Sequence, residues 1–275
     1  MTGVTLPTLL PRAAHTGKVT QLRVFSSEWT KLRSVRSTRW SLLVAFAATV
    51  GIAAIATTVL RHHWPNMGPH DRADFHPLEI NMAGVQLAQL AIGVLGVLVI
   101  TAEYSTGMIR ASMTAVPKRL PVLWGKAVVY GATTLLLMVP ATIIAFFVGQ
   151  SILAGANIPH LAFGDPGVAR AVVGAGLYLT VVGLFGLGLG AIVRNTAGGI
   201  ATFAGIMFVL PPLMNVLPSS WNNAASPYLP LQAGQAVMSI TSGNQLGPWT
   251  GFGLLCGYAA AAIAIAAMLM RRRDV

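Results

Sequence analysis

The chain has 275 residues, of which 55% are hydrophobic and only 9% are charged, and its mean hydropathy is +0.69. A soluble domain has about 25% charged residues. This composition therefore excludes a water-soluble enzyme, whereas a surface that faces lipid needs no charge. The net charge of +11 could indicate a nucleic-acid binder. However, the Lys and Arg residues lie between the apolar runs, which is typical of a membrane protein and predicts no nucleic-acid partner.

The first 39 residues precede any long apolar run. Residues 1–17 contain Pro7, Pro11 and Gly17 without a sustained period, and we expect a flexible cytoplasmic tail. Because the first long apolar run begins only near Ser41, we expect no cleavable signal peptide. The single cysteine, Cys256, lies in an apolar run and excludes an intrachain disulfide.

Residues 18–39 have the pattern of an amphipathic helix. Apolar residues recur at spacings of three and four, and Glu28 lies among them. Such a helix fits the headgroup layer of a membrane, where cations meet anionic lipid. A solvated arm is the alternative, but Trp29 and Trp40 would be poorly placed in water. The apolar residues are Leu22, Phe25, Trp29 and Leu32, and the cations are Arg23, Lys31, Arg33, Arg36 and Arg39.

Residues 40–275 contain six apolar runs, each long enough to cross a hydrocarbon core of about 30 Å as a helix. The sequence therefore predicts an all-α polytopic membrane protein, with six transmembrane helices preceded by an N-terminal amphipathic interfacial helix. The expected spans are residues 41–60, 82–102, 127–151, 171–193, 196–217 and 250–270.

The cations predict the orientation of these spans. Fifteen of the 18 Lys and Arg residues lie before the first span, after the second, after the fourth or after the sixth, and only Arg61, Arg72 and Arg170 lie on the other side. The positive-inside rule then places both termini in the cytoplasm.

Small residues and prolines predict local features of the spans. Gly186 and Gly190 form a GxxxG pattern, so we expect the fourth span to pack closely against a neighbour. Pro140 should kink the third span. Pro211 and Pro212 should distort or end the fifth.

Residues that could carry chemistry are scarce. The centres of the spans contain no Asp, Glu, Lys, Arg or His, which argues against an ion-coupled carrier and against intramembrane hydrolysis. No GxxxxGK[ST] phosphate loop occurs, so ATP would have to be hydrolysed by another chain. The loop between the first two spans is rich in His, Asp and Glu and could bind a divalent metal. Its irregular spacing favours a plain solvated loop, and no metal site is predicted.

The segment after the second span is the most informative. Glu103 and Tyr104 lie at the apolar edge, and Gly107 permits a tight turn. A cationic surface follows at Arg110, Lys118 and Arg119. From the residues alone, this is a cytoplasmic loop with a turn.

The chain resembles the permeases of type-2 ABC exporters, particularly their actinobacterial branch, from about Lys18 onward. Three stretches carry the resemblance, together with the six spans. They are Glu28-Trp29-Thr30-Lys31-Leu32-Arg33-Ser34 with Arg36-Ser37, then Glu103-Tyr104 with Gly107, Arg110, Pro117, Arg119 and Lys126, and finally Tyr228-Leu229-Pro230 with Ala233-Gly234-Gln235-Ala236.

This resemblance implies a bacterial plasma-membrane permease without catalytic residues or a cofactor of its own. The Glu103–Lys126 region would be the cytosolic coupling element and would dock on a separate ATPase chain that binds ATP and Mg. Met108 stands where many relatives have Thr. Two permease chains, identical or different, would pair. Residues 228–241 would form a short helix or re-entrant segment that caps the outer end of the pathway.

The mechanism that the resemblance implies is ATP-driven export of a hydrophobic or amphipathic cargo, such as a drug, an antibiotic, a lipid-like molecule or a peptide. Two alternatives remain open. A membrane sensor or immunity protein would bind a toxin without pumping it. An integral membrane enzyme would need clustered catalytic groups, which the sequence lacks.

Overall fold

The computed structural model describes residues 21–105, 120–216, 218–240 and 246–272, except for the side chains of residues 22–24 and 105. Throughout these residues the regular structure is helical, without strands. Six helical segments are long and apolar enough to cross a membrane, as predicted. They are α2 (Arg36–His63), α5 (Ala83–Ser105), α7 (Leu120–Ala154), α8 (Val168–Val193), a composite of α9 (Thr196–Ala204), η2 (Gly205–Val209) and α10 (Leu210–Met214), and α13 (Pro248–Arg272).

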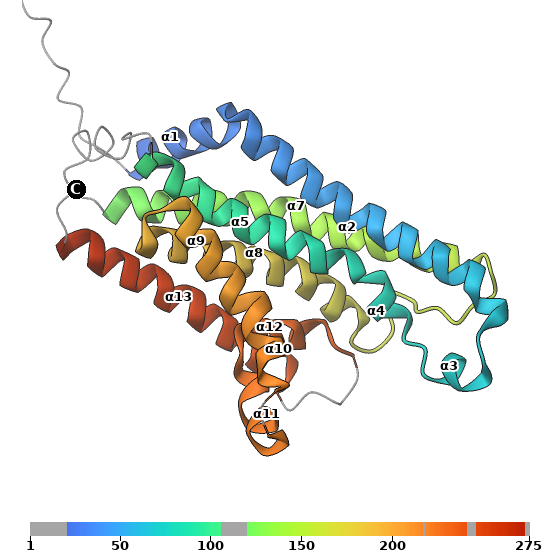
Figure 1. The fold of residues 1–275 in the computed structure, drawn as a ribbon. Helices are drawn as coiled ribbons and strands as arrows, with labels where there is room; N and C mark the ends of the chain where they lie inside the picture. Colours follow the sequence, from blue (N-terminus) through green and yellow to red (C-terminus); the bar gives the residue numbers. More distant parts are fainter. Residues whose placement is uncertain (1–20, 106–119, 217, 241–245, 273–275) are drawn as a thin grey trace, which may run out of the picture.

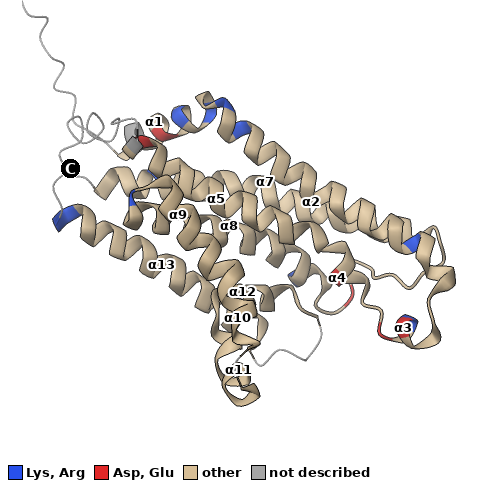
Figure 2. Ribbon diagram, viewed as in Figure 1, with Lys and Arg blue, Asp and Glu red and all other residues tan. Residues whose placement is uncertain are grey.

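Shorter helices lie at the two ends of the bundle. The helix α1 (Gln21–Ser34) precedes α2 and lies at the same end as the last turn of α13, whereas α3 and α4 lie at the opposite end (Figure 1). We call the first of these the basic end, because Lys31 belongs to α1, Arg194 follows α8 and Arg271 lies in the last turn of α13. Figure 2 shows blue Lys and Arg residues along this end. The remaining short elements are η1 (Trp64–Asn66), α3 (Pro69–Ala73), α4 (Pro77–Asn81), α11 (Ser219–Ala225), η3 (Ser226–Tyr228), α12 (Pro230–Gln235) and η4 (Ala236–Met238).

Helix α8 is the centre of the bundle and contacts α5, α7, α9 and α13. Glycines of α8 and α5 permit the close approach of these two helices. A Cβ atom on Gly186 would lie 2.3 Å from the Gly93 carbonyl oxygen of α5, and one on Gly96 would lie 2.1 Å from the Gly183 carbonyl oxygen of α8. Because backbone atoms cannot yield this space, only glycine fits these positions. The predicted close packing of the fourth span is confirmed.

The outer faces of the bundle are apolar. Leu43, Val44 and Ile55 of α2 are more than half exposed, as are Leu136 and Phe147 of α7. In water such surface would be costly, but in lipid it needs no cover.

Prolines interrupt the regular α-helix in the fifth span, whereas the third span keeps its helical assignment at Pro140. Helix α7 continues through Pro140. In the fifth span, by contrast, the α-helix gives way to a π-helical segment directly before Leu210, and α10 ends at Met214. Pro211 and Pro212 have no N–H to donate to the preceding turn, which accounts for the change. The predicted distortion of the fifth span is confirmed.

The segment predicted as one amphipathic helix over residues 18–39 is divided at Val35. Its backbone is extended, with φ −77° and ψ 108°, so α1 ends at Ser34 and α2 begins at Arg36. Arg36 and Arg39 therefore belong to the same helix as the first span.

Candidate functional site

Four charged side chains meet at the basic end of the bundle. Glu28 and Lys31 come from α1, Glu103 from the end of α5 and Lys126 from the second turn of α7. We call these four residues the ionic cluster. The Lys126 ammonium donates to Glu28 Oε2 at 2.7 Å and to Glu103 Oε1 at 2.9 Å. The Lys31 ammonium donates to Glu28 Oε1 at 2.7 Å and to Glu103 Oε1 at 3.0 Å.

Local structure brings each member into place. Glu28 and Lys31 are three residues apart on α1, so both face the bundle on one side of that helix. Leu32 packs against the core beside them. Glu103 and Lys126 are close to the two ends of the segment between α5 and α7, so the cluster joins three helices and both flanks of that segment.

The charges of the ionic cluster balance one another. Two carboxylates and two ammonium groups sum to zero, and Glu28, Glu103 and Lys126 have side chains only 5–6% exposed. Buried charges need partners with good geometry to offset their loss of hydration. Burial alone lowers the pKa of the Lys31 ammonium, but its hydrogen bond to Glu28 and the charge of Glu103 outweigh burial. The pKa of Lys31 is therefore raised above its ordinary value of 10.5.

One acceptor of the ionic cluster is left over. Glu103 Oε2 is buried and has no hydrogen-bond partner among the residues that the structure describes. Glu103 lines a cavity of about 370 Å³ that reaches from the cluster to the junction of α1 and α2. Apolar side chains of α5 and hydroxyl groups of α2 form much of its wall.

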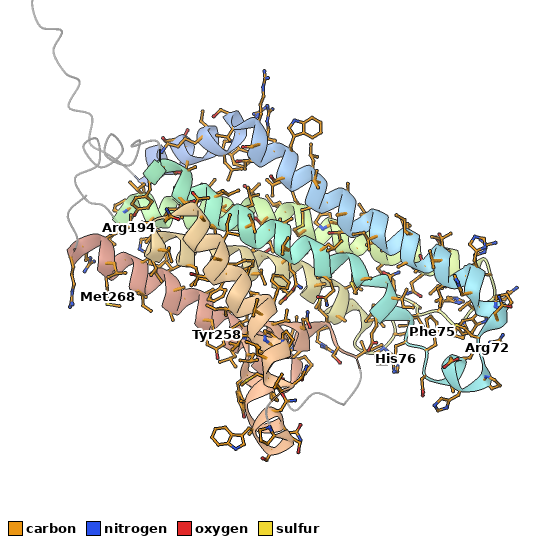
Figure 3. The ribbon with its side chains drawn as sticks, in the orientation of Figure 1. Arg72, Phe75, His76, Arg194, Tyr258 and Met268 are labelled. Carbon is orange, nitrogen blue, oxygen red and sulfur yellow. The ribbon has the colours of Figure 1, made fainter. Side chains whose placement is uncertain are left out.

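Tyr104 follows Glu103 and faces a second cation. The guanidinium carbon of Arg194 lies 5.5 Å from the centre of the Tyr104 ring. Arg194 ends α8 with a left-handed backbone, φ 58°, and donates to the Leu269 carbonyl oxygen of α13 at 3.2 Å. Figure 3 shows Arg194 and Met268 at the basic end, far from Arg72, Phe75 and His76. Through Tyr104 and Leu269, Arg194 connects the ends of α5, α8 and α13.

The structure brings together only part of each predicted residue set. In the coupling set, Glu103 and Lys126 meet in the ionic cluster, whereas Gly107, Arg110, Pro117 and Arg119 lie outside the described residues. On α1, Glu28 is buried and Lys31 and Leu32 are partly buried, while Trp29 and Arg33 are exposed. Phe25 is partly buried, and Leu22 belongs to α1 but its side chain is not described.

The predicted outer cap lies at the end of the bundle opposite the ionic cluster. Residues 230–238 form α12 and η4, as the expected short helix, and pack against α13 and α8. Pro230 and Gly234 are buried there. Tyr228 is exposed, and its carbonyl oxygen accepts a hydrogen bond of 2.8 Å from Tyr258 of α13, which Figure 3 labels. Thr241 lies outside the described residues.

A polar chain runs inward from this cap. Gln235 Nε2 donates to Gln86 Oε1 at 3.2 Å, and Gln89 Nε2 donates to the same oxygen at 2.8 Å. The Tyr178 hydroxyl of α8 donates in turn to Gln89 Oε1. Gln86 and Gln235 also line a cavity of about 420 Å³ at this end. Arg170 holds the far side of the cap by donating to the Val237 and Ser239 carbonyl oxygens at 2.9 and 3.0 Å.

The loop rich in His and Asp is mainly exposed. His70 Nε2 lies 3.4 Å from Asp74 Oδ2, and Arg72 donates to the Trp64 carbonyl oxygen at 2.9 Å. Nowhere in the described part of the chain do three His, Cys, Asp or Glu side chains group as metal ligands.

Sequence reasoning missed two features of these sites. Glu28 and Lys31 were predicted on the interfacial helix and Glu103 and Lys126 in the coupling element, without any contact between the two sets. A signal existed for this pairing, because two acidic and two basic residues lie at apolar edges of the same expected membrane side. Gln235 was predicted in the outer cap, but its link to Gln86 and Gln89 was missed, because no local pattern connects residues 149 positions apart.

Comparison with protein-family models and with curated proteins finds no match.

Proposed function

We propose that the chain is the permease subunit of an ATP-driven exporter in a bacterial plasma membrane. A separate ATP-binding chain would supply ATP and Mg and perform the hydrolysis. A second permease chain, identical or different, would complete the pathway. The resemblance of the sequence motifs to type-2 ABC exporter permeases supports this assignment.

The single observation that carries the proposal is the ionic cluster. Residues 106–119, the core of the proposed coupling element, lie between Glu103 and Lys126, which bind one another at 2.9 Å. Both flanks of this segment are therefore held at one point, and the same point is bonded to α1. A force that a partner applies to residues 106–119 would therefore be transmitted to α1, α5 and α7 together.

The distribution of charge supports an orientation with the ionic cluster at the cytoplasmic face (Figure 2). Arg194, Arg271 and the cations of α1 lie at the basic end, and Arg61 and Arg72 lie at the other. In this orientation α1 would lie along the inner leaflet, with Trp29 at the level of the headgroups. The α12 segment would then cap the outer end of the pathway. The apolar bundle suits a hydrophobic or amphipathic cargo.

The decisive experiment is a mild-detergent pull-down of the tagged chain from its native membrane. We expect an ATP-binding subunit in near-equal amount, and we expect Arg110→Glu to abolish its recovery. Arg61→Glu, the same charge reversal at the opposite end, is the matched control and should retain the partner. Recovery of the folded chain without any ATPase, under conditions that preserve a known ABC complex, would instead favour a sensor or immunity protein.

Labelling of single cysteines tests the orientation separately. In a Cys256→Ser background, Arg61→Cys should react with a membrane-impermeant maleimide on intact cells. Arg271→Cys should react only after the membrane is opened. The reverse pattern would overturn the proposed orientation and, with it, the assignment of residues 106–119 to the cytoplasm.

A further inference from the structure

The cavity beside the ionic cluster has the chemistry of a ligand site. Its floor is formed by buried residues, Glu28, Leu95, Glu103 and Lys126, and its rim by the exposed Ser34, Val35 and Ser37 at the junction of α1 and α2. At about 370 Å³ it falls in the size range of small-molecule sites. It holds roughly a dozen water-sized groups of about 30 Å³ each.

The polar groups on its wall favour one kind of ligand. Glu103 is only 4% exposed, and its Oε2 atom has no hydrogen-bond partner among the described residues. A buried carboxylate oxygen without a donor is costly, and a donor that carries positive charge satisfies it best. The ammonium groups of Lys31 and Lys126 already donate to carboxylates. An anionic ligand would therefore be repelled by Glu103 and would have to compete with these carboxylates for the two ammonium groups.

The rest of the wall suits an apolar chain. Leu95, Leu98 and Val99 of α5 and Val129 of α7 line the cavity next to the carboxylate. A polar ligand without a hydrocarbon part would leave this surface uncovered by anything but water.

We propose that this cavity binds an amphipathic amine, whose ammonium group lies beside the Glu103 carboxylate and whose chain lies along Leu95, Leu98 and Val99. An aminophospholipid of the surrounding leaflet and an amine cargo share this chemistry. Binding itself is independent of pumping, and only the identification of the bound amine as cargo rests on the proposed function.

The test uses the purified full chain in nanodiscs of phosphatidylcholine and phosphatidylglycerol, which carry no primary amine. The probe is decylamine with a diazirine in its chain, followed by irradiation and peptide mapping. We expect crosslinks at Leu98, Val99 or Val129, competed by decylamine but not by decanol or decyl sulfate. Glu103→Gln should weaken the competition about tenfold or more, because it removes the charge that receives the ammonium group.

Two further variants separate binding from folding. Leu98→Trp fills the cavity without altering the ionic cluster and should abolish the crosslinks. Ile240→Trp fills the cavity at the opposite end, which it lines, and should leave them unchanged. Equal competition by decanol, or crosslinks that persist in both Glu103→Gln and Leu98→Trp, would overturn the proposal and leave water as the occupant.

The source of the amine follows from one change of lipid. If nanodiscs that contain phosphatidylethanolamine suppress the crosslinks, the headgroup itself occupies the site. If the crosslinks persist there, the site selects a smaller amine, as a cargo would be. Both results support an amine site, and neither depends on recovery of an ATPase, so failure of the export proposal would be seen separately in the pull-down.

Discussion

Replacing Lys126 by Met removes the more deeply buried cation of the ionic cluster while keeping a side chain of similar length. The Lys126 side chain is 6% exposed and donates to Glu28 and Glu103 at 2.7 and 2.9 Å. Without it, two buried carboxylates share Lys31 alone. Removing one partner of a buried ion pair costs about 3–5 kcal/mol, because an uncompensated charge stays behind. We expect Lys126→Met to lower the free energy of unfolding by about that amount.

The other members of the cluster supply graded comparisons. Lys31 is 31% exposed, so water screens the charges that its removal leaves. Lys31→Met should cost about 1–2 kcal/mol, between the values for exposed and for buried pairs. The double variant Lys126→Met with Glu103→Gln restores neutrality, since Glu28 and Lys31 remain as one pair. It should be more stable than Lys126→Met alone.

Equilibrium unfolding in mixed dodecyl-sulfate micelles, followed by tryptophan fluorescence, measures these differences. The ranking of the three variants is the readout, because it cancels errors common to all of them. A loss below about 1 kcal/mol for Lys126→Met, or a double variant less stable than the single one, would refute the assignment of Lys126 as the counter-charge of the two carboxylates.

Three further predictions concern the packing, the outer cap and the response to pH. Gly96→Ala should cost about 1–3 kcal/mol in the same unfolding assay, because its Cβ would meet the Gly183 carbonyl oxygen, whereas Gly253→Ala, with nothing within 4 Å, should be neutral or slightly stabilising. Arg170→Gln should speed hydrogen exchange of amides in residues 233–240, as measured by mass spectrometry, and unchanged exchange there would contradict its role in holding the cap. Because the pKa of Lys31 is raised, its contribution to stability should persist through neutral pH and begin to fall only as the pH rises past 10.5, and the difference in unfolding free energy between wild type and Lys31→Met should shrink there.

Much of the fold could be predicted because lipid imposes a simple rule on the sequence. A segment that crosses the membrane must be long, apolar and helical, so six runs predicted six helices. The bounds were less accurate where a charge intervened. Hydropathy predicted that the third span begins at residue 127, directly after Lys126. Helix α7 instead begins at Leu120 and includes that lysine, because Glu28 and Glu103 neutralise it inside the protein.

The candidate site was harder to predict for a geometric reason. Lys126 lies 98 residues from Glu28 and 23 from Glu103, and no local periodicity reports such contacts. The break at Val35 was equally hidden, since residues on both sides continue the helical pattern. The polar chain through Gln89 depends on how α5, α8 and α12 are arranged, which composition does not determine.

The central position of α8 has a consequence for how the protein is made. Of its most apolar stretch, 72% is buried, against 28% for α2 and for α13. Its neighbours α5 and α7 are synthesised before it, whereas its neighbours α9 and α13 are synthesised after it. Gly188 of α8 packs closely against Ala262 of α13, because a Cβ atom added at Gly188 would lie 2.8 Å from the Ala262 Cβ atom. A chain truncated before α13 therefore exposes this glycine-lined face within the bilayer, where cellular quality control can recognise an unfinished protein.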